Sequence, residues 1–102
     1  MKLQRLALLA LMVFPTTLLA ADAKLGEEKA AMCMACHGKT GKAVIDAYPN
    51  LNGQNQQYLI NSMNAYKDGE RKGGLAAMMQ GIASSLSDED IENLAAYYSS
   101  LK

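Results

Sequence analysis

Apolar side chains recur every three or four residues near the C-terminal end of the chain. They stand at Ile91, Leu94, Ala95, Tyr98 and Leu101. This spacing predicts an amphipathic helix with one apolar face. Ser87 precedes the stretch. Asp90 lies three residues after Ser87, in the capping-box position usually taken by Glu, so the helix is predicted to begin after Ser87.

Two more segments predict helices in the middle of the chain. Residues 54–68 carry their apolar side chains mainly on one side, and Gly69 is a suitable C-terminal stop. Residues 75–85 are apolar with several small side chains, which predicts a short helix or a series of turns. Between the cysteines and the first of these helices, Pro49 and an Asn-Gly pair are typical of a turn. Because no strand of useful length is evident, the sequence predicts an all-α fold.

A face of small residues distinguishes another predicted helix, which covers residues 23–35. Gly26, Ala30 and Cys33 fall at i, i+4 and i+7 and therefore lie on one side of it. Small side chains allow a neighbouring helix to approach closely, so we expect a helix crossing at this face.

The N-terminal residues have the layout of a secretory signal peptide. Lys2 and Arg5 form a basic region, residues 6–14 are an unbroken apolar run, and Pro15 ends that run. We therefore predict that residues 1–20 direct export to the periplasm and are then removed.

Cleavage after Ala20 leaves residues 21–102 as one domain, and the small residues Ala21 and Ala23 offer alternative cleavage points. A retained membrane anchor is the competing interpretation, but the apolar run is short for a span and is interrupted by proline. Without residues 1–20 the chain has eight Lys and Arg against ten Asp and Glu, a net charge of −2. This domain lacks the basic surface that nucleic-acid binding requires.

Both cysteines and the single histidine lie in one pentapeptide, Cys-Met-Ala-Cys-His at residues 33–37. Two thiols at i and i+3 followed directly by an imidazole form the attachment pattern of c-type haem. One helical turn places Cys33 and Cys36 where each sulfur bonds a vinyl group of the same porphyrin, and His37 supplies an axial nitrogen to the iron. A disulfide or a thioredoxin-like redox pair is the competing interpretation, but that motif expects a βαβ context.

The second axial ligand is predicted to be a methionine, because the chain has no second histidine. Met32 and Met34 flank the attachment cysteines and do not reach the opposite face of the ring. Met63 is explained as core packing by the period of its helix. Met78 and Met79 remain as candidates.

Helix phase separates these two methionines if residues 75–85 are helical. Met79 then shares one apolar stripe with Leu75, Ile82 and Leu86, whereas Met78 lies about 100° away. We therefore predict Met79 as the distal ligand, with Met78 as the alternative.

The whole mature chain resembles class I c-type cytochromes, and in detail one lobe of the bacterial tandem dihaem cytochromes and their monohaem relatives. The resemblance is carried by CMACH, YPNLNGQ, QYLINSMNAYKDGER, MMQGIASSLSDEDI and LAAYYSSL. It implies a small class I cytochrome c fold, in which three main helices and short helical turns surround one covalent haem c.

The resemblance also implies roles for individual residues. The carbonyl of Pro49 accepts a hydrogen bond from the proximal His37, and Leu51 packs near the haem. The family's methionine precedes the Leu-Ser-Asp start of the last helix by seven residues, which again gives Met79. Tyr58 is a candidate hydrogen-bond donor to a haem propionate, although a core position explains it equally well. The crossing face of Gly26 and Ala30 is expected to meet Leu94 and Tyr97.

These features predict a periplasmic electron carrier of a respiratory chain and not an enzyme. An iron with histidine and methionine ligands has no site for a substrate, and partner redox proteins dock transiently near the haem edge. We expect a monomer or weak dimer. A cationic docking rim is predicted, although a solvated face explains each of its residues equally well; its members are Lys39, Lys42, Lys67, Arg71 and Lys72. The alternatives are a peroxidase-type haem enzyme, a ligand sensor with an open sixth position, and a subunit of a larger respiratory complex.

Overall fold

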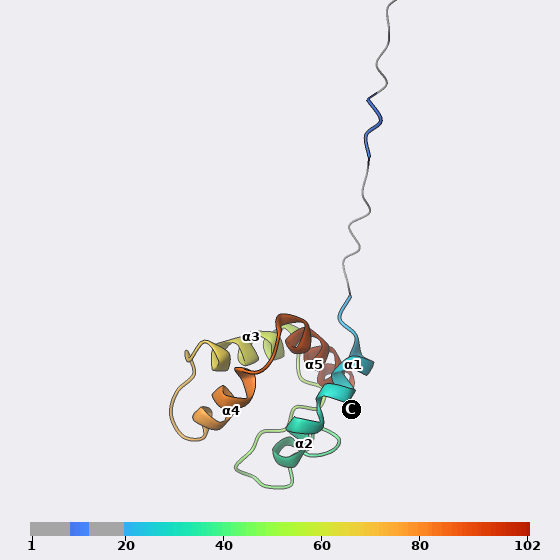
Figure 1. Ribbon diagram of the computed structural model, residues 1–102. Coiled ribbons are helices and arrows are strands. Elements are labelled where there is room, and N and C mark those ends of the chain that lie inside the picture. The colour runs from blue at the N-terminus through green and yellow to red at the C-terminus, as the bar shows by residue number, and fades with distance from the viewer. Residues whose placement is uncertain (1–8, 13–19) are drawn as a thin grey trace, which may run out of the picture.

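The computed structural model describes residues 9–12 and 20–102, and these residues form five helices (Figure 1). They are α1 (Ala23–Lys29), α2 (Ala31–His37), α3 (Gln56–Lys67), α4 (Ala76–Ala83) and α5 (Asp88–Ser100). The described residues contain no strand, so the predicted all-α fold is confirmed. Most of the predicted signal peptide, including Lys2, Arg5 and Pro15, lies outside the described residues.

A break at Ala30 divides the segment that the sequence predicts as one helix over residues 23–35. Two helices, α1 and α2, stand where one helix is predicted. The chain turns at the break because Cys33 N–H donates to Ala30 O at 2.8 Å, which forms a tighter i to i+3 turn. Ala30 is completely buried. The break turns α2 away from α1 (Figure 1), so that α1 packs on α5 and α2 is free to carry the cysteines elsewhere.

The crossing of α1 and α5 is confirmed where the small residues predict it. A Cβ placed on Gly26 would lie 2.0 Å from the backbone oxygen of Asn93 and 2.9 Å from Cβ of Tyr97. Asp22 N–H donates to Oδ1 of Asn93 at 2.8 Å, which fixes the start of α1 on the same helix. Only glycine allows the two backbones to come this close.

The buried apolar core is small and gathers along α5. Its members are Ala30, Leu59, Leu86, Ile91, Leu94, Ala95, Tyr97 and Tyr98. Of the large side chains described, Ile91 and Leu94 alone are less than 2% exposed. The packed core therefore lies between α1, α3 and α5, while α4 contacts α3 at the periphery.

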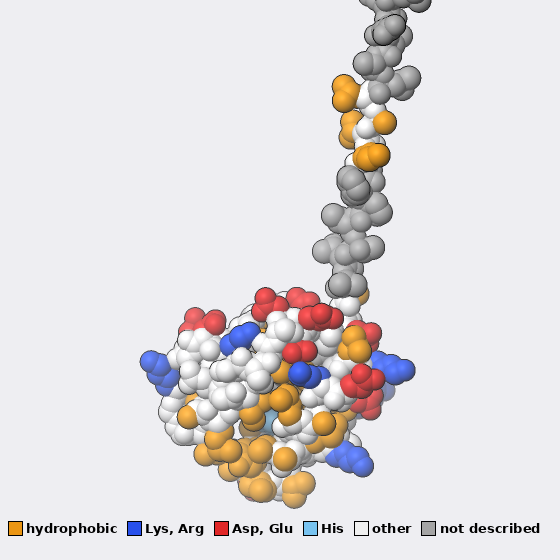
Figure 2. Space-filling view, viewed as in Figure 1, with side chains coloured by type: hydrophobic (Ala, Val, Ile, Leu, Met, Phe, Trp, Pro, Cys, Tyr) orange, Lys and Arg blue, Asp and Glu red, His pale blue; other side chains and the backbone are white. Residues whose placement is uncertain are grey.

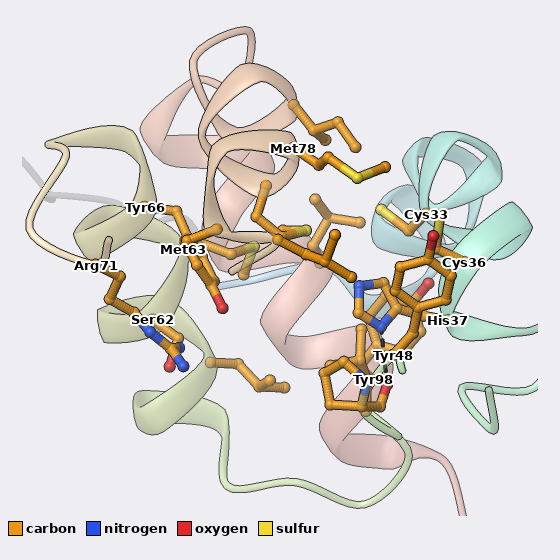
Figure 3. Close-up of a pocket in the computed structure, with 18 of the residues that line it drawn as sticks. Cys33, Cys36, His37, Tyr48, Ser62, Met63, Tyr66, Arg71, Met78 and Tyr98 are labelled. Atoms are coloured by element: carbon orange, nitrogen blue, oxygen red, sulfur yellow. Dashed lines mark hydrogen bonds between the residues drawn. The ribbon is translucent and has the colours of Figure 1, made fainter. Parts of the chain in front are cut away.

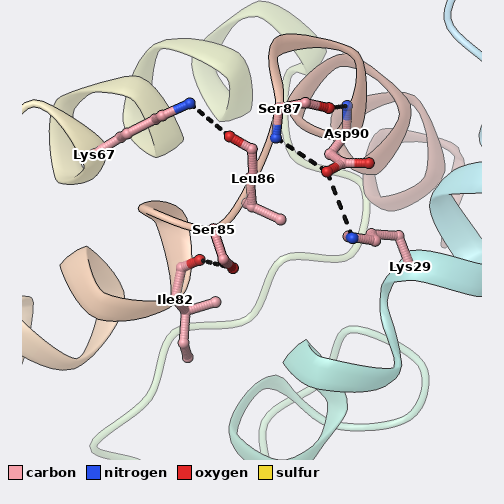
Figure 4. Close-up of polar contacts among 7 residues, drawn as sticks. All are labelled: Lys29, Lys67, Ile82, Ser85, Leu86, Ser87 and Asp90. Carbon is pink, nitrogen blue, oxygen red and sulfur yellow. Dashed lines mark hydrogen bonds and ion pairs between the residues drawn. The ribbon is translucent and has the colours of Figure 1, made fainter.

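The predicted capping box at the start of α5 is present (Figure 4). Asp90 N–H donates to Ser87 Oγ and Ser87 N–H donates to Asp90 Oδ2, each at 3.0 Å. Lys29 from α1 lies 3.5 Å from the same carboxylate. These contacts join the last helix to the first.

Replacing Asp90 with asparagine is expected to destabilise the domain slightly at pH 7 and by less at pH 3. The hydrogen bond from the Ser87 backbone, opposed in part by desolvation, and the nearby Lys29 together hold the pKa of Asp90 below its ordinary value of 3.8. A lowered pKa in the folded state stabilises the protein above pH 3.8, and the effect is lost as the pH falls through the lower value. We expect a loss below about 1 kcal/mol, measured by urea unfolding at both pH values. An equal difference at pH 3 would contradict it.

Candidate functional site

A cavity of about 430 Å³ lies in the helical domain, beside the packed core. Its lining comes from α2, α3, α4, α5 and the loops between them, and most of it is apolar. The apolar lining includes Leu51, Leu59, Met63, Ile82, Leu86 and Leu94. This volume falls within the range of about 300–1,000 Å³ that is usual for ligand and cofactor pockets.

The two thiols and the imidazole of the CMACH motif all line this cavity. Cys33, Cys36 and His37 come from one end of α2 and lie together on one side of the cavity (Figure 3). Both cysteines are free thiols, and His37 is 6% exposed. Burial is the main cause that raises the pKa of the Cys33 thiol, which is therefore neutral at pH 7. One short helix thus presents two thiols and one imidazole to the same ligand.

His37 is held by the backbone of the loop that follows it. Its Nδ1–H donates to the carbonyl oxygen of Pro49 at 2.8 Å, the contact that the resemblance implies. Because a carbonyl oxygen only accepts, the proton is on Nδ1, and Nε2 keeps its lone pair for a metal. The ring is therefore oriented before any ligand binds.

Glycines allow the loop to fold back onto the histidine. Gly38 ends α2 with φ at +83°, and a Cβ there would lie 1.8 Å from the backbone oxygen of Lys42. The carbonyl of Gly41 accepts from Leu51 N–H at 2.7 Å, and Ala43 N–H donates to Asn50 Oδ1 at 2.8 Å. These bonds close the loop and bring Pro49 against the imidazole.

Four methionines line the cavity, more than helix phase predicts. Met78 and Met79 both do so from α4, although the helix phase predicts that only Met79 faces the ligand. Met79 is partly buried, whereas Met78 is 49% exposed. Met32 and Met63 complete the set, and Met63 also packs against the core as predicted. The structure brings both candidate ligands to the cavity, and Met79 is the more enclosed.

The two secondary contacts that the resemblance implies also lie at the cavity. Leu51 is partly buried and packs against the core. Tyr58 lines the cavity but is 51% exposed, so its alternative explanation as a core residue is wrong. Its position at the rim leaves the phenol accessible to polar groups of a bound ligand.

The charged loop after α3 contributes to the cavity, which the sequence does not predict. Arg71 and Lys72 line it, and the Arg71 guanidinium carbon lies 4.4 Å from the centre of the Tyr66 ring. Figure 3 shows Arg71 on the opposite side of the cavity from Cys33. Arg71 is thus positioned for an anionic group of the ligand. In the sequence, the only indication of this role is that Arg71 follows Gly69, the predicted end of the preceding helix.

A tyrosine hydroxyl inside the cavity lacks a partner among the described residues. Tyr98 lines the cavity and is 3% exposed, and its oxygen has no hydrogen-bond partner in the described part of the chain. Burial, and to a lesser degree the neighbouring Cys33, raise the pKa of Tyr98. A buried hydroxyl without a partner is costly, so a ligand that supplies an acceptor fits this site.

The cavity and the side chains that line it define a class of protein. The cavity is large and mainly apolar, two thiols spaced by one helical turn line it, and an oriented imidazole keeps a free nitrogen toward it. This is the donor set of a helical protein that attaches a haem through two thioethers and binds its iron through histidine.

Comparison with known proteins identifies the family. The Cytochrome c family model matches residues 23–102. Cytochrome c-554(548) of Halomonas halodenitrificans is 56% identical over 81 residues, which cover 79% of this chain and 98% of that protein. The chain belongs to the cytochrome c family. It therefore carries one covalently attached haem c, takes part in haem-based electron transfer and has redox proteins as partners.

The resemblance to a lobe of larger cytochromes is also confirmed. Cytochrome c4 of Pseudomonas aeruginosa is 42% identical over 83 residues, which cover 81% of this chain but 40% of that protein. The crystal structure of reduced recombinant cytochrome c4 from Pseudomonas stutzeri matches with a TM-score of 0.72 and 39% identity, over 81% of this chain and 47% of that one. The chain thus spans less than half the length of these cytochromes c4, and it has the class I cytochrome fold.

Proposed function

We propose that this chain is a periplasmic carrier of single electrons in a respiratory chain and not an enzyme. Cys33 and Cys36 form the two thioethers, His37 is the proximal ligand, and Met79 is the distal ligand, with Met78 as the alternative. The observation that carries the proposal is the hydrogen bond from His37 Nδ1–H to the Pro49 carbonyl. It leaves Nε2 with a free lone pair on a residue that lines the cavity.

The residues around the cavity suit electron transfer better than substrate chemistry. When bound, the haem supplies an iron that exchanges one electron. His37 is held by the Pro49 carbonyl, and Met79 projects from α4 and is partly buried, an arrangement that suits two ligands that move little on electron transfer. The apolar lining excludes water from the site. Two protein ligands leave no open position for a substrate.

The start of the folded domain favours cleavage of the predicted signal peptide before Asp22. Oδ1 of Asp22 accepts from the backbone N–H groups of Lys24 and Leu25, at 2.9 and 3.2 Å, and so caps α1. Cleavage after Ala20 or Ala21 keeps this cap, whereas cleavage after Ala23 would remove it. No helix among the described residues is long and apolar enough to cross a membrane.

The surface around the cavity mouth supports transient docking of redox partners there. Figure 2 shows the single histidine between apolar side chains, with acidic side chains gathered on the opposite part of the same face. Met32, Leu75 and Met78 line the cavity and are 42–49% exposed. Of the predicted cationic rim, Lys67 donates to the Leu86 carbonyl (Figure 4), and Arg71 and Lys72 line the cavity. The exposed cationic side chains of this rim are Lys39, Lys42, Arg71 and Lys72.

The ferric absorption spectrum of the purified holoprotein tests the proposed ligation. A low-spin spectrum with a methionine-sulfur charge-transfer band is expected. A high-spin spectrum would instead favour a peroxidase-type enzyme, and rapid binding of carbon monoxide by the reduced protein would favour a ligand sensor. Either of these results would overturn the proposed function.

Replacing Met79 with alanine is expected to abolish the charge-transfer band and open the sixth position. Met78→Ala is the matched control from the same helix, and it is expected to keep the band because Met78 is the more exposed of the pair. Both variants are compared by ferric spectrum and by carbon monoxide binding. The reverse pattern would assign the distal ligand to Met78, and loss of the band in Met63→Ala alone would assign it to α3.

A further inference from the structure

The hydroxyl of Tyr98 is a polar group in the cavity with no role in ligation. It projects from α5, whereas the two attachment cysteines come from α2. The side chain is 3% exposed, and its oxygen meets the geometry of a hydrogen bond with no described residue. A group this buried requires a partner, and the missing partner lies within the cavity.

Cys33 is the neighbouring group with the largest effect on the pKa of this hydroxyl. Its side chain packs against the buried cluster that contains Tyr98. Both side chains line the same cavity, and the nearby Cys33 raises the pKa of Tyr98 after the larger effect of burial. The two side chains are thus neighbours at the cavity, and no hydrogen bond joins them in the free-thiol chain.

Thioether formation changes which of these groups donates. A free thiol donates and accepts, but a thioether sulfur has no proton and only accepts. The Tyr98 O–H is then the donor of the pair. The haem carboxylates are on the pyrrole rings opposite those that carry the vinyl groups, so a hydroxyl beside Cys33 is remote from them. Two thioether sulfurs remain as acceptors on this side, and Cys33, not Cys36, packs against the cluster that contains Tyr98.

We propose that Tyr98 is a positioning residue that donates a hydrogen bond to the thioether sulfur of Cys33 and raises the reduction potential of the haem. This inference rests on the proposed electron-carrier function. The positive end of the O–H dipole faces a sulfur that is bonded to the macrocycle, and it stabilises the added electron of the reduced state. Hydrogen bonds around a redox centre are an established means of setting its potential.

Tyr98→Phe tests this assignment in the holoprotein, since it removes the hydroxyl and keeps the ring. Tyr97→Phe is the matched control, because Tyr97 is also buried in α5 but packs at the Gly26 crossing and does not line the cavity. We expect Tyr98→Phe to lower the reduction potential and shift the carbon–sulfur stretch in the resonance Raman spectrum. In the wild type that stretch is expected to shift in heavy water. Tyr97→Phe is expected to change neither.

Thermal unfolding separates a hydrogen-bonded hydroxyl from an unpaired one. If the hydroxyl is bonded to the sulfur, Tyr98→Phe lowers the thermal midpoint or leaves it unchanged. A raised midpoint with an unchanged potential would overturn the proposal, because it is the behaviour of a buried group with no partner. A raised potential would also overturn it. If the wild type is high-spin, the proposed ligation is wrong, and the Raman shift in heavy water still decides the role of Tyr98.

Discussion

Replacing His37 with alanine is expected to abolish the low-spin haem spectrum and to leave a chain that unfolds readily. The change removes the proposed proximal nitrogen and leaves the Pro49 carbonyl without its donor at 2.8 Å. The iron–histidine bond forms in the folded state, so its loss lowers stability as well as changing the spectrum. Absorption spectra in both oxidation states and urea unfolding measure the two effects.

Pro49→Ala is the control for this experiment. The hydrogen bond uses the backbone carbonyl of residue 49, which alanine retains, so this variant is expected to remain low-spin. Added imidazole is expected to restore a low-spin spectrum to His37→Ala by entering the space of the missing ring. A wild-type spectrum from His37→Ala without added imidazole would show that the proximal assignment is wrong.

Replacing Gly26 with alanine is expected to cause a large loss of stability at the crossing of α1 and α5. The new Cβ would lie 2.0 Å from the backbone oxygen of Asn93, and a backbone atom cannot rotate away. Overpacking of this kind typically costs about 1–3 kcal/mol, a substantial part of the stability of a small domain. Urea unfolding of the holoprotein measures it.

Gly81→Ala is the matched control for the crossing. Gly81 also lies within a helix, α4, but a Cβ there would meet no atom within 4 Å. Because alanine has the higher helix propensity, this variant is expected to be more stable by up to about 1 kcal/mol. Equal losses in the two variants would mean that the effect of Gly26→Ala does not come from the helix crossing.

The helices that the sequence predicts well are those whose ends carry local signals. The reciprocal bonds of Ser87 and Asp90 require nothing beyond the segment itself, and α5 begins directly after Ser87 as predicted. Gly26 likewise predicts a close helix crossing, because a residue without a side chain lets a neighbouring backbone approach. The pentapeptide at 33–37 identifies one side of the cavity for the same reason: its chemistry depends on spacing alone.

Features that depend on tertiary contacts are the ones that the sequence does not reveal. Alanine favours helix, so nothing at Ala30 indicates a break there, and the turn is set by how α1 and α2 pack. Arg71 reaches the cavity because the loop after α3 folds over Tyr66. The apolar stripe of α5 explains Tyr98 as core, and only the structure shows that its hydroxyl ends in the cavity without a partner.

The cavity beside α5 has a consequence for quality control in the cell. A chain that has not received its haem is hollow where other domains are filled, with only Ile91 and Leu94 as fully buried large side chains in its described part. We expect such a chain to open more easily than the haem-bound protein, and proteases act on transiently open states. Attachment at α2 fills the hollow permanently, because a covalent cofactor cannot dissociate. Chains that escape proteolysis are then expected to be those that carry the haem.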